Sequence, residues 1–591
     1  MITLQLFWIP LGLLSLFCAI NLTQGHVTYI EPRYPLKGNR SPPGSPWPLP
    51  RTWTRMTSQY TLSPDHFELK SNFNCEIIEA ALLRYRGLIF IDRSKTISPK
   101  HKELESIKVH IDDTRCGYPK YGDNEKYSLT IPDKDSSGSI RAKTVWGALR
   151  GLETFSQLVY IDEKSGHYMV NATRIEDWPR FPYRGIMIDT ARHFIPIKVL
   201  LKNLDAMAWN KFNVFHWHII DDQSFPMESK IFPNLTKLGA YNDKLIYTHK
   251  DIKQLIEYAR YRGIRVIPEI DTPGHTKVIG RAFPSLLTTC YDGDTPAQSV
   301  YGKHSSHENL NPARNETFEV LRQLFIEVKN LFPDDYIHLG MDEAYYDCWM
   351  SSPEIRNFMD SKRFTEMKQV EKYYIDRTLE NVKSLGYKYI VWQDPIDNNV
   401  TLSKDAIVEV WKGGPHHEKD GWKRHVKEVL RRQNKLILSS CWYLNYINYG
   451  EDWKNYYNCD PVLGVNATEA ERELILGGEA CMWSEYVDQV NILSRLWPRA
   501  SAVAERLWSH PDDTNDTDSA LFRLDEQRCR MLRRGVEAQP LINGFCGSWE
   551  LDIEFGIHAK SSGSSIVNNQ SILIVTLVFL TYYISLIKSL Y

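Results

Sequence analysis

The sequence lacks an excess of charge of either sign, and it lacks any long basic run. Its 71 Lys and Arg residues nearly balance its 73 Asp and Glu residues, which gives a formal net charge of −2 at pH 7. A nucleic-acid-binding protein usually concentrates positive charge on one face, and no segment here offers that concentration. We therefore expect no nucleic acid among the partners of this protein.

Motifs for structural zinc and for redox chemistry are also missing. No two cysteines are separated by only two residues, which argues against a structural zinc site and against a thioredoxin-like site. We predict no cofactor. What the sequence has instead is 12% aromatic residues, including 17 Trp and 32 Tyr, which suit both stacking on sugar rings and packing of a core.

The first residues indicate export. Residues 1–25 are an apolar run followed by small and polar residues, and we interpret them as a cleaved signal peptide rather than a membrane anchor. Nine cysteines then remain for an oxidising compartment, and this odd number leaves one of them free. Six Asn-x-Thr sequons would be glycosylated there: Asn171, Asn234, Asn315, Asn399, Asn466 and Asn515.

A second apolar run closes the sequence. A Ser/Gly stretch at residues 561–565 is followed by residues 571–587, which carry no charge and just reach the lower length limit for a spanning helix. We expect residues 551–591 to form a linker and a membrane tether. The tether is either a transmembrane tail or a lipid-anchor signal, although its polar spacer is shorter than the lipid-anchor pattern prefers.

The character of the sequence changes near residue 178. Residues 26–178 mix short alternating runs at 107–111 and 127–131 with a helical stretch at 144–159, which predicts a small α+β domain. In residues 179–550, apolar β-rich segments alternate with longer amphipathic ones. The β-rich segments are residues 185–189, 212–219, 265–270, 336–340, 389–392, 407–411, 436–439 and 474–483.

Eight such alternations predict an α/β fold, a (β/α)8 TIM barrel, with helical candidates at 197–209, 249–262 and 316–331. We expect a C-terminal helix after the barrel. A doubly wound open sheet is the alternative, but no Gly-x-Gly-x-x-Gly motif opens a helix after the first strand. Periodicity alone does not prove that the sheet closes.

Polar and aromatic side chains gather where the predicted strands end. Carboxylates and histidines follow the first four segments, and tryptophans follow the last four. Chemistry in a TIM barrel lies at the carboxyl ends of its strands, so this grouping favours a sugar pocket over a phosphate or nicotinamide site.

Asp342 and Glu343 are the candidate catalytic pair, and they are adjacent in the sequence. Most glycosidases use two carboxyls about 5 to 9.5 Å apart across the sugar, whereas neighbouring side chains on a strand diverge. If the substrate carries a 2-acetamido group, the carbonyl oxygen of that group attacks the anomeric carbon. The second carboxylate then only has to orient and stabilise the amide.

Five segments resemble the family 20 β-N-acetylhexosaminidases, most closely the animal lysosomal-type α and β subunits. They are residues 189–193 (DTARH), 215–226 (FHWHIIDDQSFP), 269–275 (EIDTPGH), 338–343 (HLGMDE) and 477–483 (GGEACMW). The resemblance extends from about residue 60 to Cys546. Met341 departs from it, because relatives usually carry Gly there, and we expect Met341 to crowd the strand end without disturbing the acid pair.

The resemblance implies a retaining exo-hydrolase that removes terminal GlcNAc or GalNAc by substrate-assisted catalysis. Glu343 would be the general acid and then the base, Asp342 would hold the acetamido nitrogen, and Tyr443 the acetamido oxygen. His275 and Asp221 would relay charge, although without the resemblance they fit a loop histidine and a turn cap. The implied sugar-binding residues are Arg192, Trp392, Trp411, Asn445, Trp483 and Glu485.

Two alternatives remain at this stage. His216 and His218 alternate on a strand near Asp221, as zinc ligands do in some barrel hydrolases, but in the resembling family this segment supports the site without a metal. We therefore predict no metal. A non-catalytic surface lectin would keep the sugar pocket for recognition, and the intact Asp342-Glu343 pair argues against it.

The resemblance pairs Cys75 with Cys116, Cys290 with Cys348, and Cys529 with Cys546. We add a bond between Cys441 and Cys459, which flank the loop after the seventh segment and would close about 17 residues, worth ~3 kcal/mol. Cys481, inside an apolar strand, is then the free cysteine.

The resemblance also implies a homodimer at the cell surface or in the lysosome. The partner is a glycan that ends in β-linked GlcNAc or GalNAc, on an N-glycan, a chito-oligosaccharide, a glycolipid or a glycosaminoglycan. Asn445-Tyr446 departs from the Asn-Arg pair associated with anionic substrates, so we expect poor handling of sulfated or sialylated ones.

Overall fold

The computed structural model describes residues 41–91, 102–162, 165–293, 295–296, 309–414, 421–448, 450–544 and 546. The expected signal peptide and the expected tether lie outside these residues. Among the residues that are described, no helix combines the length and the apolar character needed to cross a membrane.

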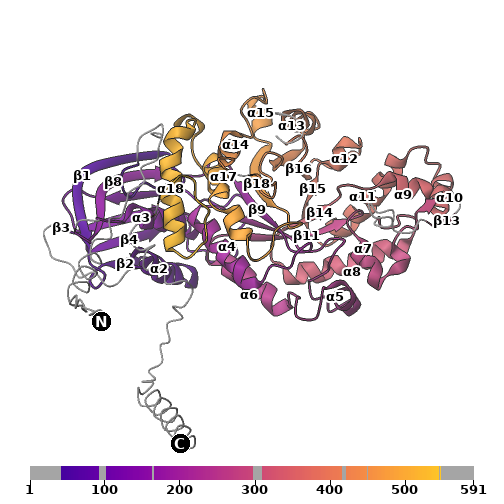
Figure 1. Cartoon of the computed structure of the whole chain (residues 1–591), viewed down its shortest axis with the longest axis horizontal. Helices are drawn as coiled ribbons and strands as arrows, with labels where there is room; N and C mark the ends of the chain where they lie inside the picture. The colour runs from indigo at the N-terminus through magenta and orange to yellow at the C-terminus, as the bar shows by residue number, and fades with distance from the viewer. Residues whose placement is uncertain are drawn as a thin grey trace, which may run out of the picture. The chain divides into compact units, whose positions relative to one another are not determined.

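The amino-terminal part is a single mixed sheet with two helices packed on it (Figure 1). Helices α2 (Glu76–Ile89) and α3 (Val145–Leu158) bury their apolar side chains in its core. The strand order is β2-β4-β6-β5-β8-β1-β3, with β7 paired to β8. The strands are β1 (Thr52–Leu62), β2 (Glu68–Ser71), β3 (Lys102–Glu103), β4 (Ser106–Ile111), β5 (Tyr127–Ile131), β6 (Ser137–Ala142), β7 (Tyr160–Ile161) and β8 (Tyr168–Asp177). The prediction of a smaller α+β domain ahead of the barrel is confirmed.

The second part is a closed barrel of eight parallel strands in the order β10-β11-β14-β15-β16-β17-β18-β9. Each predicted strand is present, and its ends differ from the predicted ones by no more than two residues. The strands are β9 (Tyr183–Asp189), β10 (Val214–His218), β11 (Arg265–Thr272), β14 (Tyr336–Gly340), β15 (Lys388–Trp392), β16 (Ile407–Val410), β17 (Lys435–Leu438) and β18 (Ile475–Met482). The TIM barrel is therefore confirmed, and the open-sheet alternative is wrong.

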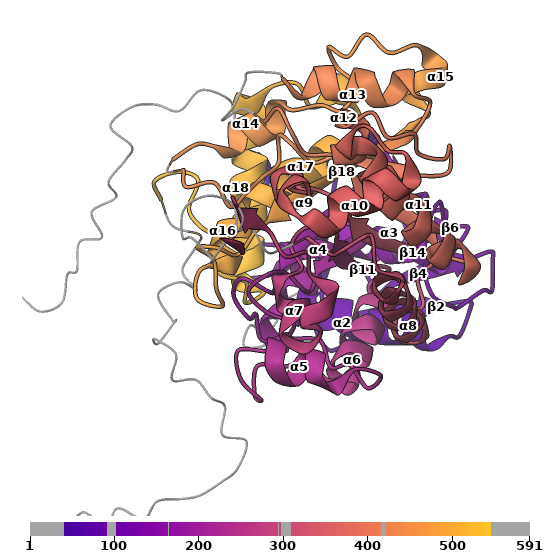
Figure 2. The ribbon, with the colours of Figure 1, turned by 90° about the vertical axis from the view of Figure 1, so that its right-hand side faces the viewer.

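Helices connect the strands around the outside. The longest are α4 (Ile197–Trp209), α6 (His249–Arg260), α8 (Asn315–Leu331) and α11 (Met367–Ser384), and the first of these has the predicted bounds. Shorter helices are inserted after the strands, including α7 (Lys277–Ala282), α9 (Tyr346–Ser351), α10 (Pro353–Lys362) and α12 (Asp394–Asp397). Figure 2 places α7, α9 and α10 near the middle of its view.

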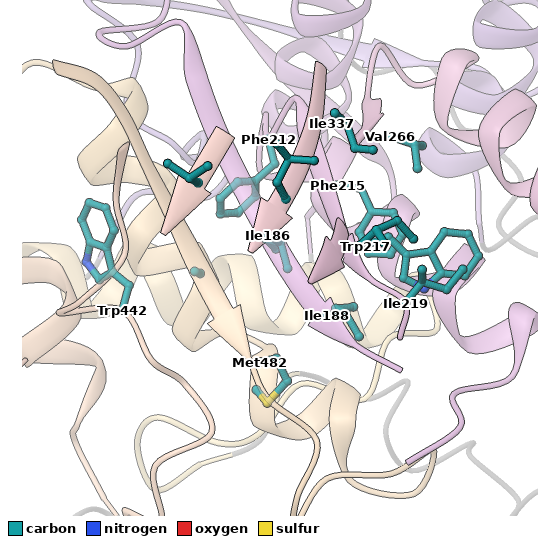
Figure 3. Close-up of a cluster of buried hydrophobic side chains, with 14 of the residues drawn as sticks. Ile186, Ile188, Phe212, Phe215, Trp217, Ile219, Val266, Ile337, Trp442 and Met482 are labelled. Carbon is teal, nitrogen blue, oxygen red and sulfur yellow. The ribbon is translucent and has the colours of Figure 1, made fainter. Parts of the chain in front are cut away.

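The side chains of the strands sort into an apolar outer set and a layered inner set. Figure 3 shows part of the outer set, with Ile186, Ile188, Phe215 and Trp217 in one buried cluster between strands and helices. Inside the barrel, the first layer at the amino ends is apolar: Tyr183, Val214, Ile267, Tyr336, Ile390, Ile407, Ile437 and Leu476. Above it lie buried charged groups, which lead to the carboxyl ends.

Buried ion pairs hold the amino-terminal domain against the barrel. Glu125 is buried and accepts from Arg150 of α3 at 2.8 Å and from Arg184 of β9 at 2.6 Å. Burial alone would raise the pKa of Glu125, but the two guanidiniums hold it below its usual value. Helix α18 (Thr517–Arg533) is followed by Arg534, whose guanidinium binds Glu153 of α3 at 2.9 Å.

The structure contains the disulfides Cys75–Cys116, Cys290–Cys348 and Cys441–Cys459. Cys529 and Cys546 are disulfide-bonded as well. Within the described part of the chain, Cys481 is the free cysteine, and it is fully buried in β18. Its thiol has a raised pKa because it is buried among carboxylates, so it is unreactive.

Candidate active site

The turn after β14 presents Asp342 and Glu343. Gly340, Met341 and Glu343 have φ values of 65°, 71° and 48°, in the left-handed region that most residues avoid. Gly340 is required there, because a Cβ at this position would lie 1.6 Å from Oδ1 of Asp271. The pair therefore follows the strand in a tight turn and not in extended geometry.

Met341 is fully buried in the outer apolar cluster. Its N–H donates to Thr272 O at 3.1 Å and to Oδ1 of Asp271 at 3.2 Å. Such a conformation costs a non-glycine residue of order 1–3 kcal/mol, which these bonds and the buried side chain offset.

Asp342 is a buried carboxyl whose pKa is raised to about 7. Burial is the main cause, and the charges of Asp394, Glu269 and Glu343 add to it, against the attraction of His275. Nε2 of His275 lies 3.6 Å from Oδ2 of Asp342. The carboxyl can therefore exchange a proton with its surroundings near neutral pH.

Glu343 is the more accessible member of the pair, with 37% of its side chain exposed. Its Oε2 accepts from the Tyr345 hydroxyl at 3.1 Å and lies 3.4 Å from Nε2 of His275. Tyr345 is fixed by Asn309, which bonds both its backbone N–H and its backbone carbonyl. Both contacts are on one carboxyl oxygen, which orients the group.

A chain of alternating histidines and carboxylates runs from the pair into the barrel. Nδ1 of His275 lies 3.2 Å from Asp221, which is 2.9 Å from Nε2 of His218. Nδ1 of His218 lies 2.5 Å from Glu269, and Glu269 is 3.0 Å from Nε2 of His216. The sequence had indicated only the His275–Asp221 step.

Carboxylates on both sides favour the charged form of the histidines in this chain. Burial alone would lower the pKa values of His216 and His218, but the neighbouring carboxylates raise both to about 10. The pKa of His275 is also raised, mainly by Asp221. Protonated imidazoles do not ligate metals, and both nitrogens of His216 and of His218 already face carboxylates. These residues therefore fit an ion-pair network better than a zinc site.

Arg192 lies where the first and last barrel strands end. Its guanidinium binds Asp189 at 2.9 Å, Asp221 at 2.8 Å and Glu485 at 3.4 Å, and it lies over the Trp483 ring. The structure thus brings together Arg192 and Glu485, two of the predicted sugar-binding residues. Through Asp221 it also joins Arg192 to the chain of histidines and carboxylates, which the sequence did not indicate.

The predicted aromatic residues form one cluster, and Trp483 joins it to Arg192. Tyr443 lies 6.4 Å from Trp411 and 6.4 Å from Trp483, and Trp392 lies 5.9 Å from Trp483. Trp392 is only 1% exposed and donates to Glu269 at 2.8 Å, so it forms the floor of the cluster. Trp411 and Trp483 are partly exposed and form its walls. Asn445 follows Tyr443, and its Oδ1 is buried without a hydrogen-bond partner among the described residues.

Sequence reasoning gave no role to several residues that contact this site. Glu269 and His338 lie within buried strands, and a charged residue in an otherwise apolar strand is the signal that could have indicated them. Asp394 accepts a hydrogen bond from the backbone N–H of Glu343, and the Tyr345 hydroxyl donates to the carboxyl of Glu343. These two residues lie in connecting segments, where no periodicity marks them.

Comparisons with known proteins match the family that the sequence motifs resemble. The family described as "Glycosyl hydrolase family 20, catalytic domain" matches residues 181–511, and "beta-acetyl hexosaminidase like" matches residues 46–158. The chain is 45% identical over 526 residues to the β-hexosaminidase α subunit of Bos taurus, across 86% of this chain and 95% of the relative. It is 43% identical over 513 residues to the human β-hexosaminidase β subunit, across 85% of this chain and 89% of that protein.

Solved structures of other proteins share the fold of this chain. The chitobiase of Flavobacterium johnsoniae superimposes with a TM-score of 0.73 at 30% identity, over 83% of this chain and 73% of that one. A Streptomyces plicatus N-acetyl-β-hexosaminidase, solved in complex with Thio-NAglucal, gives a TM-score of 0.66 at 24% identity, over 85% and 98% of the two chains.

Proposed function

Because the chain belongs to glycosyl hydrolase family 20, we propose that it is a retaining exo-β-N-acetylhexosaminidase that removes terminal GlcNAc or GalNAc by substrate-assisted catalysis. One observation carries the assignment of its centre. Two adjacent carboxyls stand at the end of β14 with a single imidazole, His275, within 3.6 Å of the first and 3.4 Å of the second. Adjacent residues are not the usual acid and nucleophile on opposite sides of a sugar, so we infer that the nucleophile comes from the substrate.

In the first step the acetamido oxygen attacks the anomeric carbon and the glycosidic bond breaks. Glu343 donates its proton to the leaving oxygen, and Asp342 accepts a hydrogen bond from the acetamido N–H as positive charge develops on the ring that forms. In the second step Glu343 takes a proton from water, which attacks the anomeric carbon and reopens that ring. Two displacements at one carbon give net retention.

The remaining site residues hold the substrate. Arg192 and Glu485 would bind sugar hydroxyls, since a guanidinium fork and a carboxylate offer complementary donors and acceptors, and Asn445 would reach the outer ones. Tyr443 would hold the acetamido oxygen. Trp392, Trp411 and Trp483 would enclose the acetamido methyl and one face of the ring.

A chromogenic N-acetyl-β-glucosaminide tests the activity directly. Glu343→Gln should lower kcat by about 100- to 10,000-fold, because a general acid typically contributes that much, while a 2-acetamido sugar inhibitor still binds. Wild-type protein that binds the inhibitor but releases no chromophore would identify a lectin. Activity lost in EDTA and restored by zinc would instead identify a metal-dependent hydrolase.

Neutral glycans are the proposed substrates. Tyr446 stacks on Tyr443 at 5.8 Å, so the position after Asn445 presents an aromatic ring in place of a cation. A sulfate or sialate there would lose water without gaining an ion pair, which is unfavourable.

We place the protein in the secretory pathway, at the cell surface or in the lysosome, with residues 551–591 as its tether. Disulfides form and persist in oxidising compartments, and the chain has several. The sequon asparagines are exposed except for Asn171, which is partly buried. Peptide mapping of the glycosylated and carboxyl-terminal fragments tests this placement.

A homodimer is proposed on the basis of apolar residues beside the site. Tyr486 and Val490 are 79% and 84% exposed in the segment after β18, and Ile447 is 74% exposed in the segment after β17. The two segments are joined by Arg495, which donates to the carbonyl of Asn448 at 3.5 Å. Exposed apolar side chains that gather in this way are typical of protein interfaces. Sedimentation of the wild type and of Tyr486→Ser with Val490→Ser tests the proposal.

A further inference from the structure

Asp394 is a buried carboxylate that contacts two parts of the proposed site at once. It follows β15 and begins α12, and it is only 6% exposed. Oδ1 accepts from the backbone N–H of Glu343 at 3.3 Å, and Oδ2 accepts from the indole N–H of Trp411 at 2.7 Å. The side chain thus touches both the proposed acid and a wall of the proposed acetamido pocket.

The bond to Glu343 acts on a residue in an unfavourable backbone conformation. Glu343 has a φ of 48°, where a non-glycine residue is held only if its surroundings fix it. A hydrogen bond from its N–H to an ionised carboxylate is of the stronger, charge-assisted kind. Because the φ of Glu343 decides where its side chain leaves the backbone, Asp394 helps to aim the carboxyl group.

A lysine just after β16 binds the same Oδ1 of Asp394 that accepts from Glu343. Lys412, the residue after Trp411, places its Nζ 2.8 Å from Asp394 and 2.9 Å from Asp397. The Gln393 side-chain oxygen accepts from the backbone N–H groups of Trp411 and Lys412, at 3.0 and 2.9 Å. Burial raises the pKa of Asp394, and the Lys412 ammonium opposes that shift. The carboxylate therefore stands in a frame that ties the ends of β15 and β16 together.

We propose that Asp394 is a positioning residue that sets the direction of the Glu343 carboxyl and the tilt of the Trp411 ring together. In this way Asp394 keeps the proton donor, Glu343, in the right position relative to the acetamido group that Trp411 encloses. The inference rests on the proposed function, in which Glu343 protonates the leaving group and Trp411 encloses the acetamido methyl. A displacement of about 1 Å in such a group can cost on the order of 100-fold in rate.

Leaving groups of different basicity separate this role from a structural one. N,N′-diacetylchitobiose has a sugar leaving group that needs a proton, whereas the dinitrophenolate of 2,4-dinitrophenyl N-acetyl-β-glucosaminide leaves without one. In Asp394→Asn, kcat/KM should fall about 30- to 100-fold for the disaccharide and less than about 5-fold for the dinitrophenyl substrate. A loss of folded protein would lower both values by the same factor.

Asp397→Asn is the matched control. Asp397 is the same residue type on the same short helix and shares Lys412, but it contacts Gln393 in place of Glu343 and Trp411. Its activity on both substrates should stay within about 3-fold of wild type. If Asp394→Asn does not fold, Asp394→Glu keeps the charge and the lysine partner while displacing the carboxylate. Asp394→Glu should also lose more kcat/KM on the disaccharide than on the dinitrophenyl substrate, but the difference should be smaller than in Asp394→Asn.

Equal losses on the two substrates, or the same preference in Asp397→Asn, would overturn the proposal. The KM of the dinitrophenyl substrate supplies a second reading, because a tilted Trp411 ring weakens the grip on the acetamido group. We expect this KM to rise several-fold in Asp394→Asn and to be unchanged in the control. A wild-type protein that cleaves neither substrate would refute the proposed function instead, which keeps the two failures apart.

Discussion

Nε2 of His275 lies 3.6 Å from Oδ2 of Asp342 and 3.4 Å from Oε2 of Glu343, so one imidazole contacts two carboxyls that are adjacent in sequence. The contact is possible because Glu343 has left-handed backbone geometry and because His275, at a φ of 56°, has it too. A small residue must stand before His275, since a Cβ at Gly274 would lie 2.9 Å from the carbonyl oxygen of Asp342. The site is thus built from two tight turns that face each other.

Asp221 contacts Nδ1 of His275, and removing the charge of Asp221 should slow the reaction. Asp221→Asn takes away the charge that favours the protonated imidazole and loosens Arg192, which binds Asp221 at 2.8 Å. We expect kcat to fall about 10- to 100-fold and KM to rise several-fold. Asp205→Asn is the control, because Asp205 binds Arg262 far from the acid pair. An Asp221→Asn enzyme with unchanged kcat would remove the charge relay from the mechanism.

Tyr345 donates to the same oxygen of Glu343 that faces His275. Tyr345→Phe keeps the ring and deletes one hydrogen bond to a charged group, worth about 1.5–3 kcal/mol. We expect kcat for chitobiose to fall about 10-fold with little change in KM. Tyr258→Phe removes a hydroxyl bonded to Asp205 and should leave kcat unchanged. Equal behaviour of the two variants would show that Tyr345 does not orient the acid.

Much of this architecture could be predicted because buried parallel strands read as short apolar runs, and all eight barrel strands were predicted. The pair Asp342-Glu343 was proposed through the family resemblance, because an Asp-Glu pair after a strand is not specific by itself. Asp394 and Tyr345 could not be predicted, since their roles depend on how separate connecting segments meet in space. The charged interior of the barrel was missed for another reason. Glu269 can be buried as a charged group only because three histidines from two other strands pair with it, and no local sequence pattern indicates such pairing.

The protein should be more stable near pH 5 than near pH 8. Burial raises the pKa values of Asp342, Glu371 and Glu409 to about 7, above the 3.8 or 4.5 of exposed carboxyls. A group with a raised folded-state pKa contributes stability that is present below its unfolded pKa and is lost as the pH rises through the folded one. His216 and His218, raised to about 10, act in the same direction between pH 6.5 and 10.

The free energy of unfolding should therefore fall between pH 5 and pH 8, as thermal melts at the two values would measure. Glu371→Gln should reduce the difference by up to about 3 kcal/mol, because it removes one carboxyl outside the catalytic pair. Glu380→Gln, at an exposed position of the same helix, is the control and should leave the difference intact. A protein that melts higher at pH 8 than at pH 5 would contradict these protonation states.

The disulfide between Cys441 and Cys459 closes the segment that carries Tyr443 and Asn445. Replacing both cysteines with serine should destabilise the protein by about 3 kcal/mol in the chain-entropy model. It should also raise KM for 2-acetamido substrates, because Tyr443 would lose its support. Mass spectrometry of the alkylated wild type checks the bond itself, and free thiols at both positions would refute it.

The central claim is that the substrate supplies the nucleophile, and one comparison tests it most directly. The measurement is kcat/KM for 4-nitrophenyl N-acetyl-β-glucosaminide and for 4-nitrophenyl β-glucoside, which differ only in the 2-acetamido group. We predict that the glucoside is cleaved at least about 1,000-fold less efficiently, since it has no internal nucleophile. Comparable efficiencies for the two substrates would contradict the account.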